Sequence, residues 1–141
     1  MTHTRELLDS SALTLVPQVS SDRLAAAVDA MLECEEAVTA CAAAMLAGDD
    51  ALNLRDAIAR DHNCADVVAT TRRVLTRDGD VALLSAQLEA CVIACEHSTQ
   101  SCGKHAAHHE HCRICSEATQ RCAEQCRQVI QGLHGANTRG K

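Results

Sequence analysis

Ten cysteines are the side chains of this 141-residue sequence that are best suited to do chemistry. Cys91 and Cys95 are four positions apart, and so are Cys122 and Cys126. On a helix this spacing places two sulfur atoms one turn apart on one face. There they could reach a single metal ion in near-linear coordination, whereas a disulfide fits helix geometry poorly. The spacing therefore favours thiolate binding of metal.

Charge and ligand softness indicate which metal these thiols would bind. Soft thiolate and thioether ligands favour Cu(I). Each Cu(I) replaces one thiol proton, so that a filled core stays near neutral. A Zn(II) bound by four thiolates carries a net charge of −2, and several such sites in one low-dielectric core would repel each other. We therefore predict multiple Cu(I) ions per chain, on the order of one per thiol or somewhat fewer.

A secreted disulfide scaffold is the alternative that an even cysteine count in a short chain suggests. The sequence begins MTHTRELLDSS, which is charged and polar and lacks the apolar region of an export signal. It also has no run of roughly 18 apolar residues that could span a membrane. We therefore expect a cytoplasmic protein, with no membrane partner, whose cysteines remain reduced.

The elements that position these thiols are predicted to be helices. The sequence has no Phe, Tyr or Trp and one Pro, and good helix formers such as Ala dominate. Ser, Asp and Gly residues mark helix ends. A short lead helix is predicted over Thr4–Asp9, and long helices over Arg23–Leu46, Ala51–Arg77, Val81–Cys102 and His109–Gln131.

Short connections make consecutive helices antiparallel neighbours. The expected fold is therefore all-α, an antiparallel up-down four-helix bundle with a short N-terminal lead helix. In this division residues 1–19 form a lead segment, residues 20–134 form the bundle and residues 135–141 form a disordered tail.

Every cysteine falls on the helix face that should point to the bundle axis. These residues are Cys34, Cys41, Cys64, Cys91, Cys95, Cys102, Cys112, Cys115, Cys122 and Cys126. Simple core packing would explain one or two buried cysteines, but not ten on four converging faces. Asp61 lies on the same face of the second long helix. A buried carboxylate needs a partner, so Asp61 is expected to pair with an Arg, to bind metal or to relay protons.

The two ends of the predicted bundle differ in composition. One end collects the aliphatic residues Leu24, Val28, Leu75, Val81, Leu84, Val129, Ile130 and Leu133. The opposite end collects Met45, Cys102, His105, His108, His109, His111 and Cys112. This asymmetry favours a closed apolar end and a metal entry mouth, although a solvated His-rich turn is the simpler interpretation.

Other functions fit the sequence less well. His108, Cys112 and Cys115 have the spacing found in zinc-containing anti-sigma factors, but a single zinc site leaves at least six cysteines unexplained. The pair Cys112 and Cys115 has CxxC spacing without the βαβ pattern of a thiol redox enzyme. No Glu-x-x-His or Gly-rich phosphate loop occurs, so we predict no enzyme activity. A net charge of −6 without a basic patch argues against nucleic acid as a partner.

Residues 90–126 read ACVIACEHSTQSCGKHAAHHEHCRICSEATQRCAEQC, and residues 61–75 read DHNCADVVATTRRVL. Both segments resemble the bacterial copper storage proteins, cysteine-rich four-helix bundles that store Cu(I). The resemblance covers roughly residues 25–131 and is greatest to the cytosolic branch. It implies copper sites at all ten cysteines, with His105, His109 and His111 at the mouth. It also implies a homotetramer, and a copper chaperone is a possible delivery partner.

The sequence departs from the family pattern at three positions. Val68, Ser98 and Thr119 stand where members of the family commonly carry cysteine. We therefore expect this chain to hold fewer copper ions than a relative with a complete set of thiols.

Overall fold

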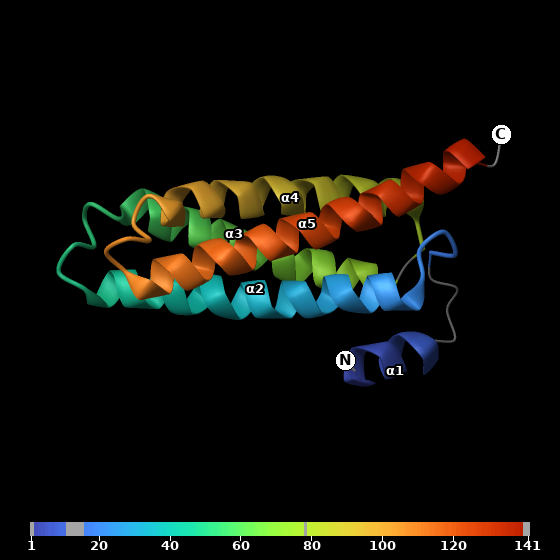
Figure 1. Cartoon of the computed structure of the whole chain (residues 1–141), viewed down its shortest axis with the longest axis horizontal. Coiled ribbons are helices and arrows are strands. Elements are labelled where there is room, and N and C mark those ends of the chain that lie inside the picture. Colours follow the sequence, from blue (N-terminus) through green and yellow to red (C-terminus); the bar gives the residue numbers. More distant parts are fainter. Residues whose placement is uncertain (1, 11–15, 78, 140–141) are drawn as a thin grey trace.

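The computed structural model describes residues 2–10, 16–77 and 79–139. Over these residues it contains α1 (Thr2–Ser10), α2 (Ser21–Ala47), α3 (Arg55–Leu75), α4 (Val81–Gly103) and α5 (Glu110–Arg139), and no strand. Helices α2 to α5 run alternately in opposite directions, and each packs against its neighbours in a four-helix bundle (Figure 1). The all-α bundle with a short lead helix is thus confirmed, and α1 packs against the outside of α2.

Side-chain caps set the beginnings of two helices. The side chain of Ser20 accepts a hydrogen bond from the backbone N–H of Arg23, and Asp80 does the same for Leu83 at 3.1 Å. Both residues satisfy backbone donors that the first turn of a helix leaves unpaired. These caps fix where α2 and α4 begin, and with that the level of the cysteines on these two helices.

Two helix boundaries differ from the prediction by more than two residues. Helix α3 begins at Arg55 rather than Ala51, because Asp50 accepts a 2.7 Å hydrogen bond from Asn53 in a turn that buries Leu54. Helix α5 passes Gly132, where the sequence predicts a stop, and continues to Arg139. A Cβ at Gly132 would lie 3.0 Å from Cγ2 of Val19, so this glycine permits close packing instead of ending the helix.

The interior has the predicted apolar end. Leu24, Leu75, Leu84, Leu88, Val129 and Leu133 are all at most 2% exposed. Val28 is buried beside them, whereas Val81 and Ile130 are only partly buried and pack against this core from its edge. Without aromatic rings, close packing of these aliphatic side chains must exclude water. This end of the bundle is therefore closed and dry.

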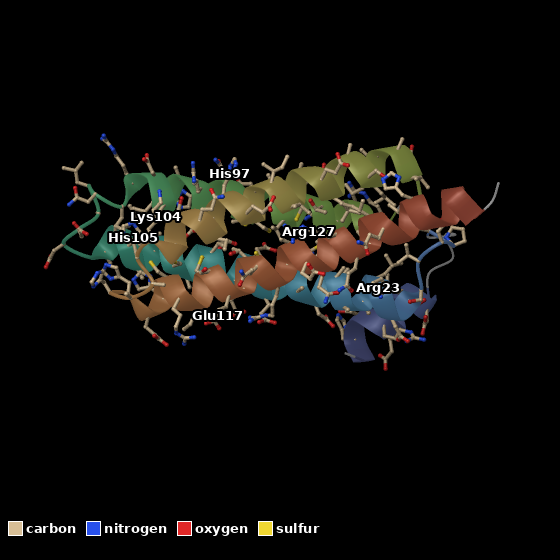
Figure 2. All side chains as sticks on the ribbon, turned by 45° about the horizontal axis from the view of Figure 1, so that its top comes forward. Arg23, His97, Lys104, His105, Glu117 and Arg127 are labelled. Carbon is tan, nitrogen blue, oxygen red and sulfur yellow. The ribbon has the colours of Figure 1, made fainter. Side chains whose placement is uncertain are left out.

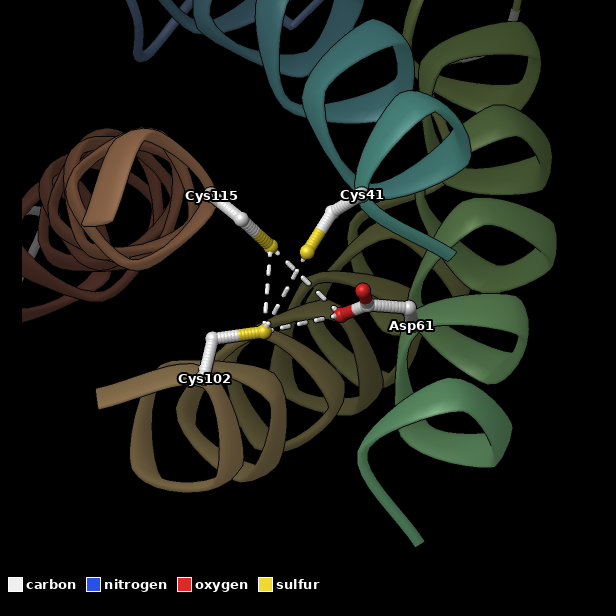
Figure 3. Close-up of side chains that lie close together, drawn as sticks. All are labelled: Cys41, Asp61, Cys102 and Cys115. Atoms are coloured by element: carbon white, nitrogen blue, oxygen red, sulfur yellow. Dashed lines mark hydrogen bonds between the residues drawn. The ribbon is translucent and has the colours of Figure 1, made fainter. Parts of the chain in front are cut away.

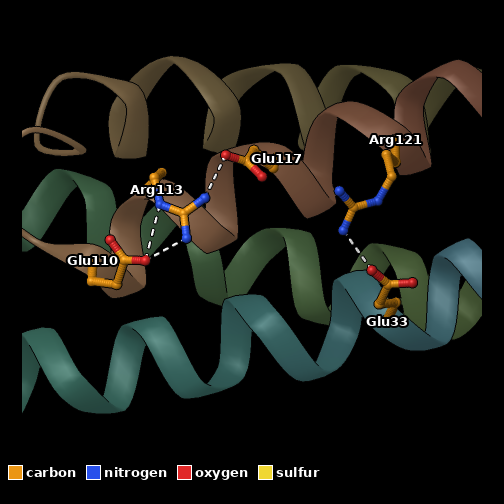
Figure 4. A network of polar contacts seen from close by, with 5 residues as sticks. All are labelled: Glu33, Glu110, Arg113, Glu117 and Arg121. Atoms are coloured by element: carbon orange, nitrogen blue, oxygen red, sulfur yellow. Dashed lines mark hydrogen bonds and ion pairs between the residues drawn. The ribbon is translucent and has the colours of Figure 1, made fainter.

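Charged side chains cover the outside of the bundle, as the labelled Arg23, Glu117 and Arg127 show (Figure 2). Arg113 forms ion pairs with Glu110 and Glu117 along α5, and Arg121 pairs with Glu33 across to α2 (Figure 4). Exposed pairs of this kind contribute little to the stability of the fold, because water and salt screen the two charges. No helix in the part of the chain that the structure describes is both long and apolar enough to cross a bilayer.

Candidate metal centre

All ten cysteines lie inside the bundle, at most 1% exposed, and each is a free thiol. Helical spacing therefore predicted their location correctly. The tertiary structure sorts them into two groups, which we name the outer cluster and the deep cluster. The outer cluster lies toward the His-rich end and consists of Cys41, Cys102, Cys112 and Cys115. The deep cluster lies toward the apolar end and consists of Cys34, Cys64, Cys91, Cys95, Cys122 and Cys126.

The outer cluster brings one acidic side chain together with thiols from the three other helices (Figure 3). The Sγ atoms of Cys102 and Cys115 are 3.4 Å apart, and that of Cys41 lies 3.9 Å from Cys102. Oδ1 of Asp61 lies 3.4 Å from the sulfur of Cys102 and 3.5 Å from that of Cys115. All four ligand atoms are within 4.8 Å of one another. Such a group can surround one small ion.

Hydrogen bonds prepare one thiol of this group for ionisation. Contacts with Cys102 and Cys41 lower the pKa of Cys115 to about 6, against the opposing effect of burial. The pKa of Cys102 is raised to about 11, chiefly by its contact with Cys115. The contacts within the cluster therefore favour ionisation of the Cys115 thiol over that of Cys102. A thiolate is the form that binds metal.

Asp61 is fully buried, and the structure gives it a partner that the sequence did not identify. Ser98 donates a 2.6 Å hydrogen bond to Oδ1, whereas Oδ2 has no partner among the described residues. Burial is the largest effect on this carboxyl and raises its pKa to about 7. The expected pairing with an arginine is not found among the described residues. Two features of the sequence pointed to Ser98: its place on the inward face of its helix, and its position where the proteins that this sequence resembles commonly carry cysteine.

The entry mouth contains a histidine in contact with sulfur. Nδ1 of His111 lies 3.3 Å from the sulfur of Cys41 and 3.5 Å from that of Cys112, and the three residues form a second ligand group. Partial burial, and then the nearby His109, lower the pKa of His111 and favour its neutral, ligand-competent form. The ring of His109 stacks on His111 at 5.3 Å, and the ring of His105 lies 6.5 Å from His109. The three imidazoles thus lead from the surface to Cys41.

Two other residues were predicted for the His-rich end of the bundle, and one of them is buried whereas the other is exposed. Met45 is buried in the core at 1% exposure. His108 is exposed and belongs to none of the ligand groups that the described residues form. The structure therefore does not bring His108 together with Cys112 and Cys115, as the alternative zinc site would require.

The deep cluster is built entirely of sulfur. Cys64 lies 3.8 Å from both Cys34 and Cys95, and Cys126 lies 3.6 Å from Cys91. Cys122 shares one ligand group with Cys34 and Cys95 and a second with Cys91 and Cys126. Hydrogen bonds with Cys34 and Cys95 lower the pKa of Cys64 to about 5.

These separations suit bridging coordination. A metal–sulfur bond of about 2.3 Å, as in zinc–thiolate sites, lets one ion in linear coordination join sulfur atoms about 4.6 Å apart. The sulfur–sulfur contacts of 3.4 to 3.9 Å are slightly shorter than this span. Small movements of side chains would open them to admit ions, and each sulfur can serve two ions. Both clusters can therefore hold several soft ions with little change in the helices.

Comparisons with known proteins agree with this geometry. A family model described as copper storage protein matches residues 20–131. The uncharacterized cysteine-rich protein YhjQ of Bacillus subtilis (strain 168) is 31% identical over 104 residues, which cover 74% of this chain and 93% of YhjQ.

Two solved structures come from Streptomyces lividans. The copper storage protein Ccsp loaded with 10 copper equivalents superposes with a TM-score of 0.87 at 35% identity, over 92% of this chain and 98% of Ccsp. A cytosolic copper storage protein with five coppers gives a TM-score of 0.76 at 36% identity, and the match covers 77% of this chain and 92% of that protein's chain. With most of its length matched by the family model, this chain belongs to the copper storage protein family.

Proposed function

We propose that this protein stores Cu(I) by binding several ions per chain to the thiols inside its bundle. One observation carries the proposal: ten buried, unbridged cysteines from four helices meet in clusters with sulfur–sulfur distances of 3.4 to 3.9 Å. Soft sulfur ligands select Cu(I), and a monovalent ion leaves the filled core near neutral. The protein would hold ions rather than convert a substrate, so we expect no enzyme activity.

The proposed ligands include residues besides the ten cysteines. Asp61 offers Oδ1, which lies 3.4 Å from the sulfur of Cys102 and 3.5 Å from that of Cys115, to an ion in the outer cluster. His111 offers its ring nitrogen beside Cys41. His105, His109 and Met45 would receive and pass on incoming ions at the mouth. Residues 20–134 would form the copper-binding unit, with lead segment 1–19 and tail 135–141 outside it.

The cellular setting is part of the same proposal. A structural relative is described as a cytosolic copper storage protein, and we propose that this chain also acts in the cytosol. We further propose that it assembles as a homotetramer and receives copper from a chaperone. Sedimentation equilibrium of the purified protein tests the assembly, and a monomer would contradict it.

Anaerobic titration of the reduced apo-protein with Cu(I) tests the proposed storage. We expect uptake of several ions per chain, measured by metal analysis after gel filtration, with helicity unchanged by circular dichroism. The helices already position the thiols, so binding requires little refolding. Saturation at one ion per chain would contradict storage and would favour a single-site regulatory protein.

Replacing the mouth histidine that contacts sulfur should slow copper uptake. In a His111→Ala variant the initial rate of copper uptake is expected to fall at least about fivefold with little change in final capacity, because all ten thiols remain. His97→Ala is the matched control, since His97 is exposed on α4 away from the mouth (Figure 2). The initial rate of copper uptake by each variant is measured by stopped-flow absorbance as Cu(I) transfers from a coloured chelator to the protein. Equal slowing in both variants would exclude a specific role for the mouth.

A further inference from the structure

The two thiol clusters are separate from each other. Every sulfur–sulfur contact found, from 3.4 to 3.9 Å, joins two members of the same cluster. The ligand groups of the described residues likewise contain outer thiols or deep thiols, and none contains both. The interior is therefore not one continuous column of sulfur.

The separation follows from the spacing of cysteines on three helices. The outer and deep thiols are seven residues apart on α2, on α4 and on α5. At a rise of 1.5 Å per residue this is about 10.5 Å along each helix. The inward positions halfway along these intervals are occupied by Val38, Ser98 and Thr119, all of them fully buried. We call these three residues the sulfur-free layer.

The sulfur-free layer offers poor ligands to a soft ion. A linear S–metal–S unit spans about 4.6 Å, which is less than half of the interval. The hydroxyl of Ser98 already donates a hydrogen bond to Asp61, and the hydroxyl of Thr119 donates a 2.9 Å hydrogen bond to the carbonyl of Cys115. Val38 contributes only methyl groups. An ion that crosses this layer must leave sulfur for hard or apolar surroundings, which raises the barrier to movement.

The deep cluster has no other open approach along the bundle axis. Its far side is closed by the aliphatic residues that include Leu84, Leu88 and Leu133, each at most 1% exposed. The outer cluster, in contrast, touches the half-buried His111 at the mouth. Ions that enter at the mouth therefore reach the outer thiols first and the deep thiols only through the sulfur-free layer.

We propose that this protein holds copper in two compartments, an outer one that exchanges rapidly and a deep one that fills and empties slowly, with Ser98 and Thr119 controlling passage between them. The proposal rests on the proposed storage of Cu(I). It gives the three departures from the family pattern different roles, because Val68 lies one turn beyond Cys64 on the deep side of the layer.

The kinetics of loading test the two compartments. The reduced protein is mixed anaerobically with Cu(I) held by a coloured chelator, and transfer is followed by absorbance. We expect two phases, the second at least about tenfold slower than the first. Replacing Cys91 and Cys95 with Ser should reduce the amplitude of the slow phase alone. Replacing Cys102 and Cys112 with Ser should reduce the amplitude of the fast phase.

A variant that continues the sulfur column tests the role of the layer directly. Ser98→Cys combined with Thr119→Cys should bring the two rates within about threefold of each other. Val68→Cys is the matched control, because it adds a thiol outside the layer and should leave two distinct phases. Circular dichroism establishes that each variant is folded, and the small size of these exchanges favours folding.

The possible outcomes separate the two proposals. Uptake of many ions in one phase by the unmodified protein would overturn the compartments and leave storage intact. An unchanged ratio of rates in the Ser98→Cys/Thr119→Cys variant would remove the layer as the barrier. Uptake of no more than one ion would instead contradict storage itself.

Discussion

Replacing Asp61 with Asn should make the apo-protein more stable than the unmodified protein at pH 8, by roughly 4 kcal/mol, with almost no difference near pH 4. Burial raises the pKa of this carboxyl to about 7, above its ordinary value of 3.8. Between these values the unfolded chain releases the proton and the folded chain keeps it. Stability from this group is therefore fully present below the lower pKa and is lost as pH rises through the higher one.

Asparagine has a similar shape and does not ionise, so it removes this loss. Urea unfolding of the reduced, metal-free proteins at several pH values from 4 to 8 measures the difference. Asp66→Asn on the same helix is the control, because Asp66 is exposed and its replacement should change stability little at any pH. Parallel pH dependences for the Asp61→Asn and unmodified proteins would show that the Asp61 carboxyl ionises as freely in the fold as in the unfolded chain.

Copper loading should raise the melting temperature by at least about 10 °C. A ligand that binds the folded state at 100 times its dissociation constant adds about 2.7 kcal/mol per site, and several sites act together here. For a chain of this size each kcal/mol corresponds to roughly 3 °C. Unfolded cysteines also bind copper, which reduces the gain, but only the folded bundle holds thiols from different helices within 3.9 Å.

Anaerobic thermal unfolding, followed by circular dichroism at 222 nm, would measure the melting temperatures of the apo-protein and the loaded protein. Removing copper with a strong chelator should restore the lower melting temperature, which separates metal binding from irreversible oxidation. The Cys91→Ser/Cys95→Ser variant should show a smaller rise, because it loses deep ligands. If the fully loaded protein had the same melting temperature as the apo-protein, the ions would have to bind outside the bundle.

The cost of Asp61 in the apo state and its place among the outer thiols are connected. A buried carboxylate is unfavourable without a cation. Displacement of thiol protons by Cu(I) would bring positive charge within reach of Oδ1 and would offset that cost. In the apo-protein the hydrogen bond that Ser98 donates to Oδ1 offsets part of that cost. Stability in the empty state is thus reduced at a position where an arriving ion would restore it.

Much of the fold was predictable from the sequence because helix signals are local. Caps such as Ser20 and Asp80, and the periodicity of apolar residues, depend on neighbours along the chain. The two misplaced boundaries depend on distant or side-chain contacts. A glycine at position 132 is typical of a helix end, yet here it leaves room for the side chain of Val19 from another part of the chain. Local composition cannot distinguish a glycine that ends a helix from one that permits close packing.

The sequence by itself determined which thiols point inward and at which level of the bundle they lie, because helical spacing fixes both within a single helix. Only the tertiary structure decided which sulfur atoms from different helices meet, that Ser98 is the partner of Asp61, and that His111 is the histidine in contact with Cys41. These contacts depend on the rotation and offset of whole helices, which packing of four faces sets together. The same packing aligns three seven-residue intervals into one layer without sulfur.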